Sequence, residues 1–325
     1  MVMTKSPVEL GVIAKAVELA CRAPSLHNSQ PWRWVASKTG VDLFADPHRV
    51  VRSSDSSGRQ ALIGCGAALD HFRVAMAAAG WNTTVEQFPN PDKLDHVASI
   101  SFTPLEFVTQ VWRERADAIL HRRTDRLPLR APAVSLERLL RSTLSPLATL
   151  DILADDARPR LVEAARLTES LRSRDDFYHQ EIQWWTASFR LAEGVPSSAL
   201  ISESERRRVE VNRRFRLSGY GDRRATTPVD ESSILVLSTP GDTREDALNC
   251  GQVLSTVLLD CTATGLATCP MTHMTELATS RDIIRQLTER EGMPQVLIRV
   301  GIAPSIENIP PPTPRRSVRE VLEFR

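Results

Sequence analysis

Apolar residues recur every three or four positions over the first part of the chain, which is the spacing of one face of a helix. The residues are Leu10, Ile13, Val17 and Ala20. The preceding tetrapeptide Ser6-Pro7-Val8-Glu9 has the form of a capping box with proline at the first helical position. Because Pro24 disfavours helical backbone in the residue before it, we expect this helix to end near Arg22.

The next stretch, 23–34, shows neither helical nor alternating spacing of apolar residues. It carries polar side chains between Pro24 and Pro31, together with two tryptophans. This composition predicts a structured loop. The loop leads into two short expected strands, near 33–36 and 41–45.

Two long apolar stretches, 57–80 and 242–265, resemble one another. Ser57 and Asp242 would be their N-caps, and a glycine ends each stretch. Aligned without gaps at a spacing of 185 residues, they share six identities over 24 positions, where chance gives about one or two. The identical pairs are Arg59/Arg244, Cys65/Cys250, Gly66/Gly251, Leu69/Leu254, Ala78/Ala263 and Gly80/Gly265.

Each long helix is followed by an expected strand that ends before a proline, at 97–102 and at 295–301. The chain therefore looks like two related halves, 1–112 and 113–325. The long helices are too apolar to face water on any side. Such helices beside strands predict an α+β fold with buried central helices.

One segment, about 190–232, has no counterpart in the first half and is rich in arginine. Two interpretations stay open at this point. The segment is either a solvated, partly helical surface excursion, or a lid over a ligand site, because long insertions in compact domains are often functional.

Charge and cysteine content limit the classes of partner and the cellular compartment that we expect. With 41 Lys+Arg against 40 Asp+Glu over 325 residues, the chain has no overall field that attracts nucleic acid or an anionic membrane, so we expect neither as a partner. The five cysteines form no Cys-x-x-Cys pair, which favours reduced thiols in the cytoplasm. Charges interrupt the apolar N-terminal stretch, which argues against a signal peptide, and no stretch approaches 18 apolar residues. We therefore expect a cytoplasmic protein.

Three polar clusters can carry chemistry. The loop from Pro24 to Trp32 holds a hydroxyl, amides and backbone donors suited to the edge of a flat heterocycle, although a polar turn has the same composition. The run from His121 to Arg126 brings together three guanidiniums and a hydroxyl, which suit a phosphate. The pair at 315–316 would add two more guanidiniums. Taken singly, each arginine pair is also typical of a solvated surface.

Other motifs carry less weight. Gly64-Cys65-Gly66 lacks the third glycine of a dinucleotide fingerprint and lies inside a predicted helix. His71 and His273 are isolated in sequence, without the spacing of a metal site, and we interpret both as structural. The pair at 184–185, two tryptophans, is interpreted as core, with a wall of a ligand pocket as the alternative.

Taken together, these features resemble the FMN-dependent nitroreductase superfamily, and especially the mycobacterial Acg-type nitroreductases. The shared features are the Pro-Ser-x-x-Asn-x-Gln-Pro-Trp loop at 24–32, the Arg-Arg-Thr-x-Arg run at 122–126, a long apolar helix ending in Gly-Leu, and a late arginine. Members are usually homodimers with two FMN sites at the interface. The resemblance thus implies an α+β nitroreductase-like fold in which two fused halves form a pseudo-dimer. Because each part of the site occurs once here, it predicts one FMN per chain and makes a monomer sufficient.

The resemblance also implies a set of cofactor-binding residues. The phosphate and ribityl chain would be held by Arg122, Arg123, Thr124, Arg126 and Arg315. The isoalloxazine would be contacted by Pro24, Ser25, Asn28 and Gln30. The turn after the second long helix would lie on the N5 side of the ring through Cys269, Pro270 and Met271.

By the same resemblance, NADH or NADPH would reduce the flavin at N5, and a nitroaromatic or quinone acceptor would reoxidise it. The family needs no side-chain nucleophile, so no catalytic residue is named, and no metal is expected. The alternative is a non-catalytic protein that stores or sequesters FMN under a closed lid. This chain departs from the family in two places: Thr124 stands where the family usually has serine, which is a mild chemical change, and the turn 265–269 is poorer in glycine. The turn, the charged insertion and the loss of the second site favour the alternative.

Overall fold

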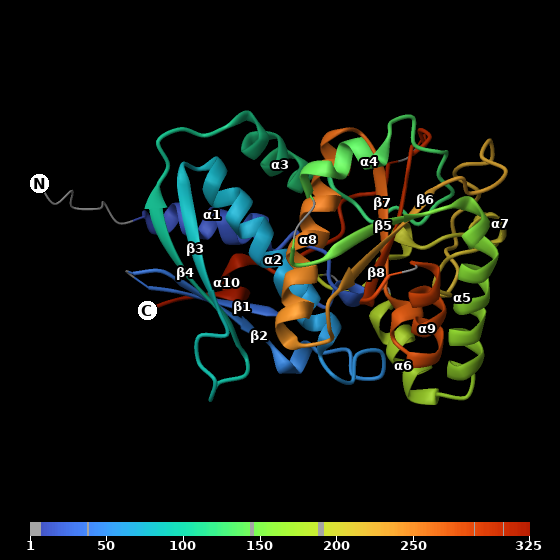
Figure 1. The fold of residues 1–325 in the computed structure, drawn as a ribbon, viewed down its shortest axis with the longest axis horizontal. Coiled ribbons are helices and arrows are strands. Elements are labelled where there is room, and N and C mark those ends of the chain that lie inside the picture. Colours follow the sequence, from blue (N-terminus) through green and yellow to red (C-terminus); the bar gives the residue numbers. More distant parts are fainter. Residues whose placement is uncertain (1–7, 38, 144–145, 188–191, 289, 308) are drawn as a thin grey trace, which may run out of the picture.

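Two antiparallel layers of strands lie on either side of a pair of long helices, α2 (Arg59–Ala78) and α8 (Arg244–Ala263), as Figure 1 shows. This computed structural model describes residues 8–37, 39–143, 146–187, 192–288, 290–307 and 309–325. The two helices pack against each other at the centre, where most of their residues are buried. The expected mixed α+β architecture is therefore present.

The two sheets have corresponding strand orders. The first, β3-β4-β2-β1-β9, contains β1 (Trp32–Ala36), β2 (Val41–Ala45), β3 (Trp81–Gln87), β4 (His96–Pro104) and β9 (Leu322–Phe324). The second, β5-β6-β8-β7, contains β5 (Thr149–Leu153), β6 (Ser233–Thr239), β7 (Ala267–Met271) and β8 (Met293–Gly301). Apart from β9, which pairs in parallel with β1, the order β1-β2-β4-β3 matches β5-β6-β8-β7, all antiparallel. In each half two strands precede the long helix and two follow it.

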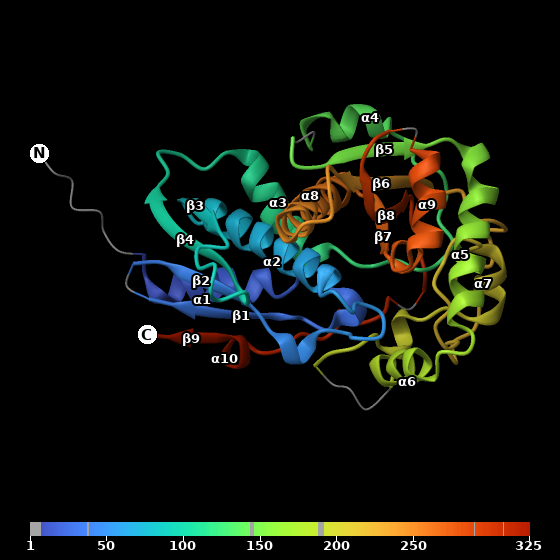
Figure 2. The ribbon, with the colours of Figure 1, turned by 60° about the horizontal axis from the view of Figure 1, so that its bottom comes forward.

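Shorter helices cover this frame. They are α1 (Leu10–Ala20), α3 (Gln110–His121), α4 (Leu136–Leu139), α5 (Arg158–Arg172), α6 (Asp176–Trp185), α7 (Glu203–Arg208), α9 (Ala278–Leu287) and α10 (Val318–Val321). Helix α1 packs on α2, and α3 packs on both α2 and α8. Helices α5 and α9 pack together beside the second sheet, with α6 and α7 farther along that side (Figure 2).

Glycines at two repeat positions allow α2 and α8 to touch. A Cβ on Gly66 would overlap the carbonyl oxygen of Leu248, and a Cβ on Gly251 would overlap that of Ile63. The contact is reciprocal, because the spacing of 185 residues that relates the two glycines also relates Ile63 to Leu248. Reciprocal contacts of this kind are typical of a twofold interface. Together with the matching strand orders they support the internal duplication, which stays a prediction.

The ends of the long helices are close to those predicted, but other residues cap them. Helix α2 has Gly58 in the N-cap position with a φ of 73°. The cap comes from Asp55 rather than from Ser57, because the Asp55 carboxylate accepts hydrogen bonds from the N–H groups of Gln60 and Ala61. The predicted N-cap at Ser57 was therefore wrong.

The second long helix begins one residue later than predicted. Thr243, not Asp242, is its N-cap, because Thr243 and Asp246 form a reciprocal capping box. Both helices end as predicted at glycines in the left-handed region, with φ of 88° at Gly80 and 78° at Gly265. The first predicted helix is confirmed from Leu10, whereas its predicted capping residues lie mostly outside the described part of the chain.

The two halves interlock more than the sequence suggested. The predicted boundary at residue 112 falls inside α3, and the C-terminal strand β9 adds to the sheet of the first half. The segment without a counterpart is also longer than predicted. It runs from the end of β5 to the start of β6, 154–232, and contains α5, α6 and α7, whereas only 37–40 separate β1 from β2.

The described part of the predicted insertion, 192–232, is not a solvated excursion. Glu205 has no exposed surface and pairs with Arg223 at 2.9 Å. Arg224, which is 4% exposed, pairs with Asp125 of the second half at 2.6 Å. Buried ion pairs need well-ordered partners, so this segment is an integral layer of the fold.

Helix α2 corrects one expectation about apolar stretches. By length and hydropathy it is long and apolar enough to cross a membrane, although we expected no such stretch. Within the fold 89% of that window is buried, and Leu69 and Phe72 have no exposed surface. A central core helix of this kind meets the same criteria as a membrane span. Of the two adjacent tryptophans, Trp185 is buried as predicted, whereas Trp184 is 53% exposed.

Candidate functional site

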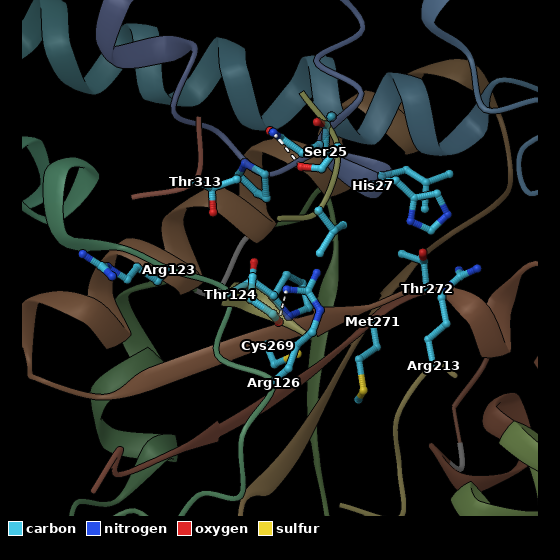
Figure 3. A pocket seen from close by; sticks show the side chains of 18 of the residues that line it. Ser25, His27, Arg123, Thr124, Arg126, Arg213, Cys269, Met271, Thr272 and Thr313 are labelled. Carbon is cyan, nitrogen blue, oxygen red and sulfur yellow. Dashed lines mark hydrogen bonds between the residues drawn. The ribbon is translucent and has the colours of Figure 1, made fainter. Parts of the chain in front are cut away.

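A cavity lies between the two halves and collects segments that are far apart in the sequence. It is lined by the loop after α1, the run after α3, the end of β7, the insertion and the C-terminal segment, with α2 and α8 beside them. Eleven of the twelve predicted cofactor residues line it, namely Pro24, Ser25, Asn28, Arg122, Arg123, Thr124, Arg126, Cys269, Pro270, Met271 and Arg315. In Figure 3 His27 and Arg213 lie at one end of the cavity, and Arg123 and Thr313 at the other.

The loop after α1 has a backbone that side chains rarely adopt. His27, Asn28 and Gln30 have φ of 51°, 58° and 51°, in the left-handed region. The Ser25 hydroxyl holds this shape by accepting a hydrogen bond from the Gln30 N–H at 2.9 Å. Trp32, with no exposed surface, anchors the loop in the core as expected. Strained backbone that is held this firmly is typical of functional sites.

Gln30 is the one predicted cofactor residue that does not line the cavity. Its Nε2 donates to the Ala192 carbonyl of the insertion at 2.8 Å, and its Oε1 accepts from the Arg316 N–H at 2.8 Å. Asn28 acts in a similar way while lining the cavity, since its Nδ2 donates to the carbonyls of Gly194 and Pro314. Both amides therefore tie the loop to neighbouring segments.

One end of the cavity, formed by Arg22, Arg122 and Arg315, is strongly cationic. The Nη2 atoms of Arg122 and Arg315 both donate to the Arg22 carbonyl, at 2.9 and 3.2 Å. The Nε and Nη1 of Arg122 and the Nε of Arg315 are buried and have no hydrogen-bond partner among the residues that the structure describes. Burial and the neighbouring guanidiniums lower the pKa of Arg122 to about 10 and that of Arg315 to about 9. Both groups are still charged at neutral pH.

No acidic side chain compensates this charge within the described lining of the cavity. The lining contains six arginines, Arg22, Arg122, Arg123, Arg126, Arg213 and Arg315, and neither aspartate nor glutamate. Buried guanidiniums without a carboxylate, with N–H groups left over, favour an anion as the missing partner. This end of the cavity is therefore suited to a phosphate.

The rest of the run after α3 borders the middle of the cavity. Thr124 forms an isolated bridge with Thr268, which fixes the run beside β7. Arg126 lies over the ring of Phe215 at 5.4 Å, and burial lowers its pKa. Asp125, the one carboxylate of the run, is paired with Arg224. Its charge therefore secures the insertion.

The other end of the cavity holds neutral imidazoles and an aromatic ring. The ring centroids of His27 and Phe215 lie 5.6 Å apart, edge to face. Burial, with Arg213 nearby, lowers the pKa of His27 and of His273 well below the ordinary value. The Nε2 of His27 and both ring nitrogens of His273 are buried and have no hydrogen-bond partner in the described part of the chain. Arg213 itself is paired with the buried Glu276.

The segment at the end of β7 lines the cavity as predicted. Cys269 and Met271 are buried, and Pro270 lies between them. Burial raises the pKa of the Cys269 thiol, so this sulfur stays protonated at neutral pH. A protonated thiol is a poor nucleophile.

Sequence reasoning missed several lining residues. Arg22 and His27 lie next to the predicted loop residues but were not selected, and His273 was interpreted as structural although it lines the cavity. Arg213 and Phe215 belong to the insertion, which has no counterpart in the first half. His71, by contrast, lies at the helix crossing as a structural residue, with its Nδ1 2.8 Å from the Ser255 hydroxyl.

Mycobacterial proteins are among the known relatives of this chain. The chain is 52% identical over 326 residues, 99% of this chain and 98% of the relative, to the Mycobacterium tuberculosis H37Rv protein named "Putative NAD(P)H nitroreductase acg". It is also 52% identical over 321 residues, 97% of this chain and 93% of the relative, to "Uncharacterized protein Rv3127" of the same organism.

Among solved structures, the FMN-dependent nitroreductase NfnB from Mycobacterium smegmatis, in complex with NADPH, has 17% sequence identity and a TM-score of 0.40, covering 66% of this chain and 100% of that chain. No family model matches the chain. The relatives at 52% identity, aligned over nearly the full length of both chains, are enough to assign the family. The chain belongs to the nitroreductase superfamily, in its mycobacterial acg-type family.

Proposed function

We propose that this protein is a flavoprotein that binds one FMN in the cavity and transfers electrons from NADH or NADPH to a nitroaromatic or quinone-type acceptor. One observation carries the proposal: the cavity between the halves ends in guanidiniums that lack carboxylate partners and retain unpartnered N–H groups. The names of relatives, which include an NAD(P)H nitroreductase, agree with it.

The chain's own donors fit the phosphate end of FMN. Arg122 and Arg315 present buried N–H groups that a phosphate oxygen would satisfy. Arg123, Thr124 and Arg126 follow along the same wall and would hold the rest of the phosphate and the ribityl hydroxyls. The described lining contains no carboxylate that could balance these charged donors, so a dianion fits better than a neutral ligand.

The remaining lining fits a flat ring system. Pro24 and Ser25 lie on the side of α2, and Cys269 and Met271 lie on the side of β7. A Cβ added at Gly64 of α2 would lie 3.4 Å from the Ser25 Cβ, so helix and loop are packed closely. When bound, FMN supplies the hydride- and electron-accepting centre. The chain orients it, excludes water and places the Arg126 charge near the middle of the cavity.

The neutral end of the cavity would receive the electron acceptor. Phe215 offers an aromatic face, and the Nε2 of His27 and both ring nitrogens of His273 have no partner among the described residues. Nitro and quinone oxygens accept hydrogen bonds from N–H groups of this kind. No side chain is required as a nucleophile.

One FMN per chain follows from the asymmetry of the halves. The strand order makes β5 the counterpart of β1, so a second flavin loop would precede β5, within 131–148. That stretch contains no Pro-Ser-x-x-Asn-x-Gln-Pro-Trp sequence. Since both halves contribute to one cavity, we also propose a monomer.

The deciding experiment is the visible spectrum of the purified protein during anaerobic titration with NADPH and then NADH. A yellow protein that bleaches on addition of reductant is a working reductase, and acceptors are then screened by their ability to restore the colour. A protein that purifies colourless and takes up no FMN contradicts the whole proposal.

Storage or sequestration of FMN is a second candidate function, favoured by the position of the insertion. Gly194, Val195, Pro196 and Phe215 form a wall of the cavity, and the loop amides bond to this wall. A flavin closed off in this way would stay oxidised in the titration. Deleting 197–227 would remove the buried Val211 and Glu205, so a point substitution is the better test.

Phe215→Ala removes the ring that faces the cavity, and Leu217→Ala, at an exposed position outside the lining, is the matched control. If the protein stores FMN, we expect Phe215→Ala, but not Leu217→Ala, to release FMN faster or to allow reduction of the flavin by NADPH. If both variants behave as the wild type, the insertion does not close the site.

A further inference from the structure

The ends of α1 and α3 occupy equivalent places about the pseudo-twofold axis. Val74 and Leu259, 185 residues apart, lie in one small apolar cluster together with Ile119. Leu19 of α1 packs against the same cluster, and Ile119 is its counterpart on α3 at a spacing of 100 residues. At that spacing Arg22, after α1, corresponds to Arg122, after α3.

The two arginines make reciprocal contacts across this axis. The Nε and Nη2 of Arg22 donate to the carbonyls of Ile119 and Leu120 at the end of α3, at 3.2 and 3.0 Å. The Nη2 of Arg122 donates to the carbonyl of Arg22 at the end of α1, at 2.9 Å. Each guanidinium is thereby held at the C-terminus of the opposite helix, which favours cations.

We propose that Arg22 is a phosphate-binding residue contributed by the first half, so that the counterpart of Arg122 from the lost second site serves the one surviving site. The proposal rests on the proposed function, because the phosphate in question is that of FMN. It goes beyond the resemblance, which assigned the phosphate only to residues after α3 and to Arg315.

The position of Arg22 supports this role. Arg22 lines the cavity, and its carbonyl is the atom on which Arg122 and Arg315 converge. Its Nε and Nη2 are used by α3, which leaves Nη1 outside these bonds. The guanidiniums of Arg122 and Arg315 meet at one carbonyl, and that of Arg22 is close enough to lower the pKa of both. With no acidic residue in the described lining, these three cations match a terminal phosphate that carries about two negative charges.

The mutual repulsion of these three charges is a second reason to expect an anion here. Arg22 and Arg122 both contribute to the lowered pKa of Arg315, and Arg22 contributes to that of Arg122. The three groups therefore repel one another when no anion is bound. A phosphate in their midst would remove this repulsion, so inorganic phosphate alone should stabilise the apoprotein.

Riboflavin provides the internal reference for the test, because it has the ring of FMN but no phosphate. Affinities for FMN and riboflavin are measured by flavin fluorescence in the full-length apoprotein, for the wild type, Arg22→Gln and Arg22→Lys. We expect Arg22→Gln to weaken FMN binding by about 10- to 100-fold and to leave riboflavin binding within about twofold. Arg22→Lys, which keeps the charge but not the planar fork, should fall between.

Arg244→Gln is the matched control, because the Arg244 guanidinium also donates to a carbonyl, that of Leu94, but does not line the cavity. Its FMN and riboflavin affinities should equal those of the wild type. Equal weakening of both flavins in Arg22→Gln, or unchanged FMN affinity, would mean that Arg22 only caps α3, and the proposal would be overturned.

A second measurement separates this proposal from the proposed function. The Tm of the apoprotein is recorded with increasing inorganic phosphate. A rise in the wild type that is absent in Arg22→Gln supports the anion site, even if the wild type binds no FMN, in which case the cofactor assignment fails alone. No rise in either protein overturns the anion site.

Discussion

Arginines in two regions of this molecule are in opposite electrostatic states. In the insertion, three arginines each pair with a carboxylate: the buried Arg213 with Glu276, the buried Arg224 with Asp125, and the half-buried Arg223 with Glu205. At the cationic end of the cavity, within the described residues, Arg122 and Arg315 bond only to backbone carbonyls and keep unpartnered nitrogens. The same residue type therefore holds the fold together in one region and is available to a ligand in the other.

Burial alone does not distinguish the two regions. Arg122 is 6% exposed and Arg224 is 4% exposed. The difference lies in the partners, because a paired buried charge is part of the folded structure, whereas an unpaired one destabilises it until an anion binds. Substitutions at the two places should consequently have opposite effects on stability.

The largest effect is expected for Arg122→Ala combined with Arg315→Ala. Each charge-assisted bond to phosphate contributes about 1.5 to 3 kcal/mol, so FMN affinity should fall by about two to four orders of magnitude. The free energy of unfolding of the apoprotein should be unchanged or higher, because an uncompensated charge is removed. Equilibrium dialysis and urea unfolding measure the two quantities.

Arg316→Ala is the control for that double variant. Its guanidinium follows Arg315 directly but does not line the cavity and bonds to the Glu320 carbonyl. FMN affinity should stay within about twofold. Unchanged FMN occupancy in the double variant would contradict the assignment of the phosphate to this end of the cavity.

Glu205→Gln tests the paired region and should be the next largest effect. Glu205 accepts hydrogen bonds from Arg223 and from the Ser202 N–H, and it has no exposed surface. Leaving Arg223 without its carboxylate should lower the free energy of unfolding by about 3 to 5 kcal/mol. Glu203→Gln, in the exposed pair with Arg206 on the same helix, should change it by less than about 1 kcal/mol.

Equal losses in the two glutamate variants would contradict the contrast between buried and solvated pairs within α7. A loss in Glu205→Gln that FMN restores would instead mean that the insertion is ordered mainly by the flavin. Unfolding curves recorded with and without FMN distinguish these outcomes.

The arginine run at 206–208 allows the same comparison between a solvated and a bonded arginine at neighbouring positions. Arg207 has a side chain 77% exposed, and Arg207→Ala should change stability by less than about 0.5 kcal/mol. Arg208 has a side chain 13% exposed and donates to the carbonyls of Arg224 and Thr227 at 2.5 and 2.6 Å. Arg208→Ala should therefore cost about 2 kcal/mol, measured by urea unfolding. Similar changes in the free energy of unfolding for the two variants would mean that the bonds from Arg208 to the Arg224 and Thr227 carbonyls do not stabilise the fold.

The sequence predicted the frame of the fold because that frame depends on local signals. The apolar stretches and the stop glycines predicted the two long helices. The identities at a spacing of 185 predicted the repeat, and one identical pair, Gly66 and Gly251, lies where the two helices touch. The N-caps were missed because Asp55 reaches α2 from outside the predicted start, and Thr243 competes successfully with its neighbour Asp242.

The cavity was predicted less completely than the frame. Eleven of the twelve predicted cofactor residues line the cavity, yet no local pattern tells that Gln30 bonds to Ala192 instead of lining it. Nor does any local pattern separate Arg223, which pairs with a carboxylate, from Arg122, which has no carboxylate partner among the described residues. Pairing depends on tertiary contacts between segments, and a single sequence does not contain them.

The smallest predicted effect concerns the buried histidines at the neutral end of the cavity. His27 and His273 face Arg213, and His27 also faces Arg126, so burial and these cations lower their pKa well below the ordinary value of about 6.5. The unfolded chain therefore binds more protons than the folded one below pH 6.5. Their contribution to stability is complete above that pH and is lost as the pH falls below it.

Each of the two histidines should remove up to about 1.4 kcal/mol per pH unit from the free energy of unfolding between pH 6.5 and the lowered pKa. His27→Gln should reduce this slope by the contribution of one histidine, up to about 1.4 kcal/mol per pH unit. Urea unfolding of the apoprotein from pH 7.5 to 5 measures the slope. His48→Gln, at an exposed position outside the cavity, should leave the slope unchanged. An identical slope in His27→Gln and wild type would mean that His27 is protonated in the folded protein. The neutral end of the cavity would then also be cationic, and the contrast between its two ends would disappear.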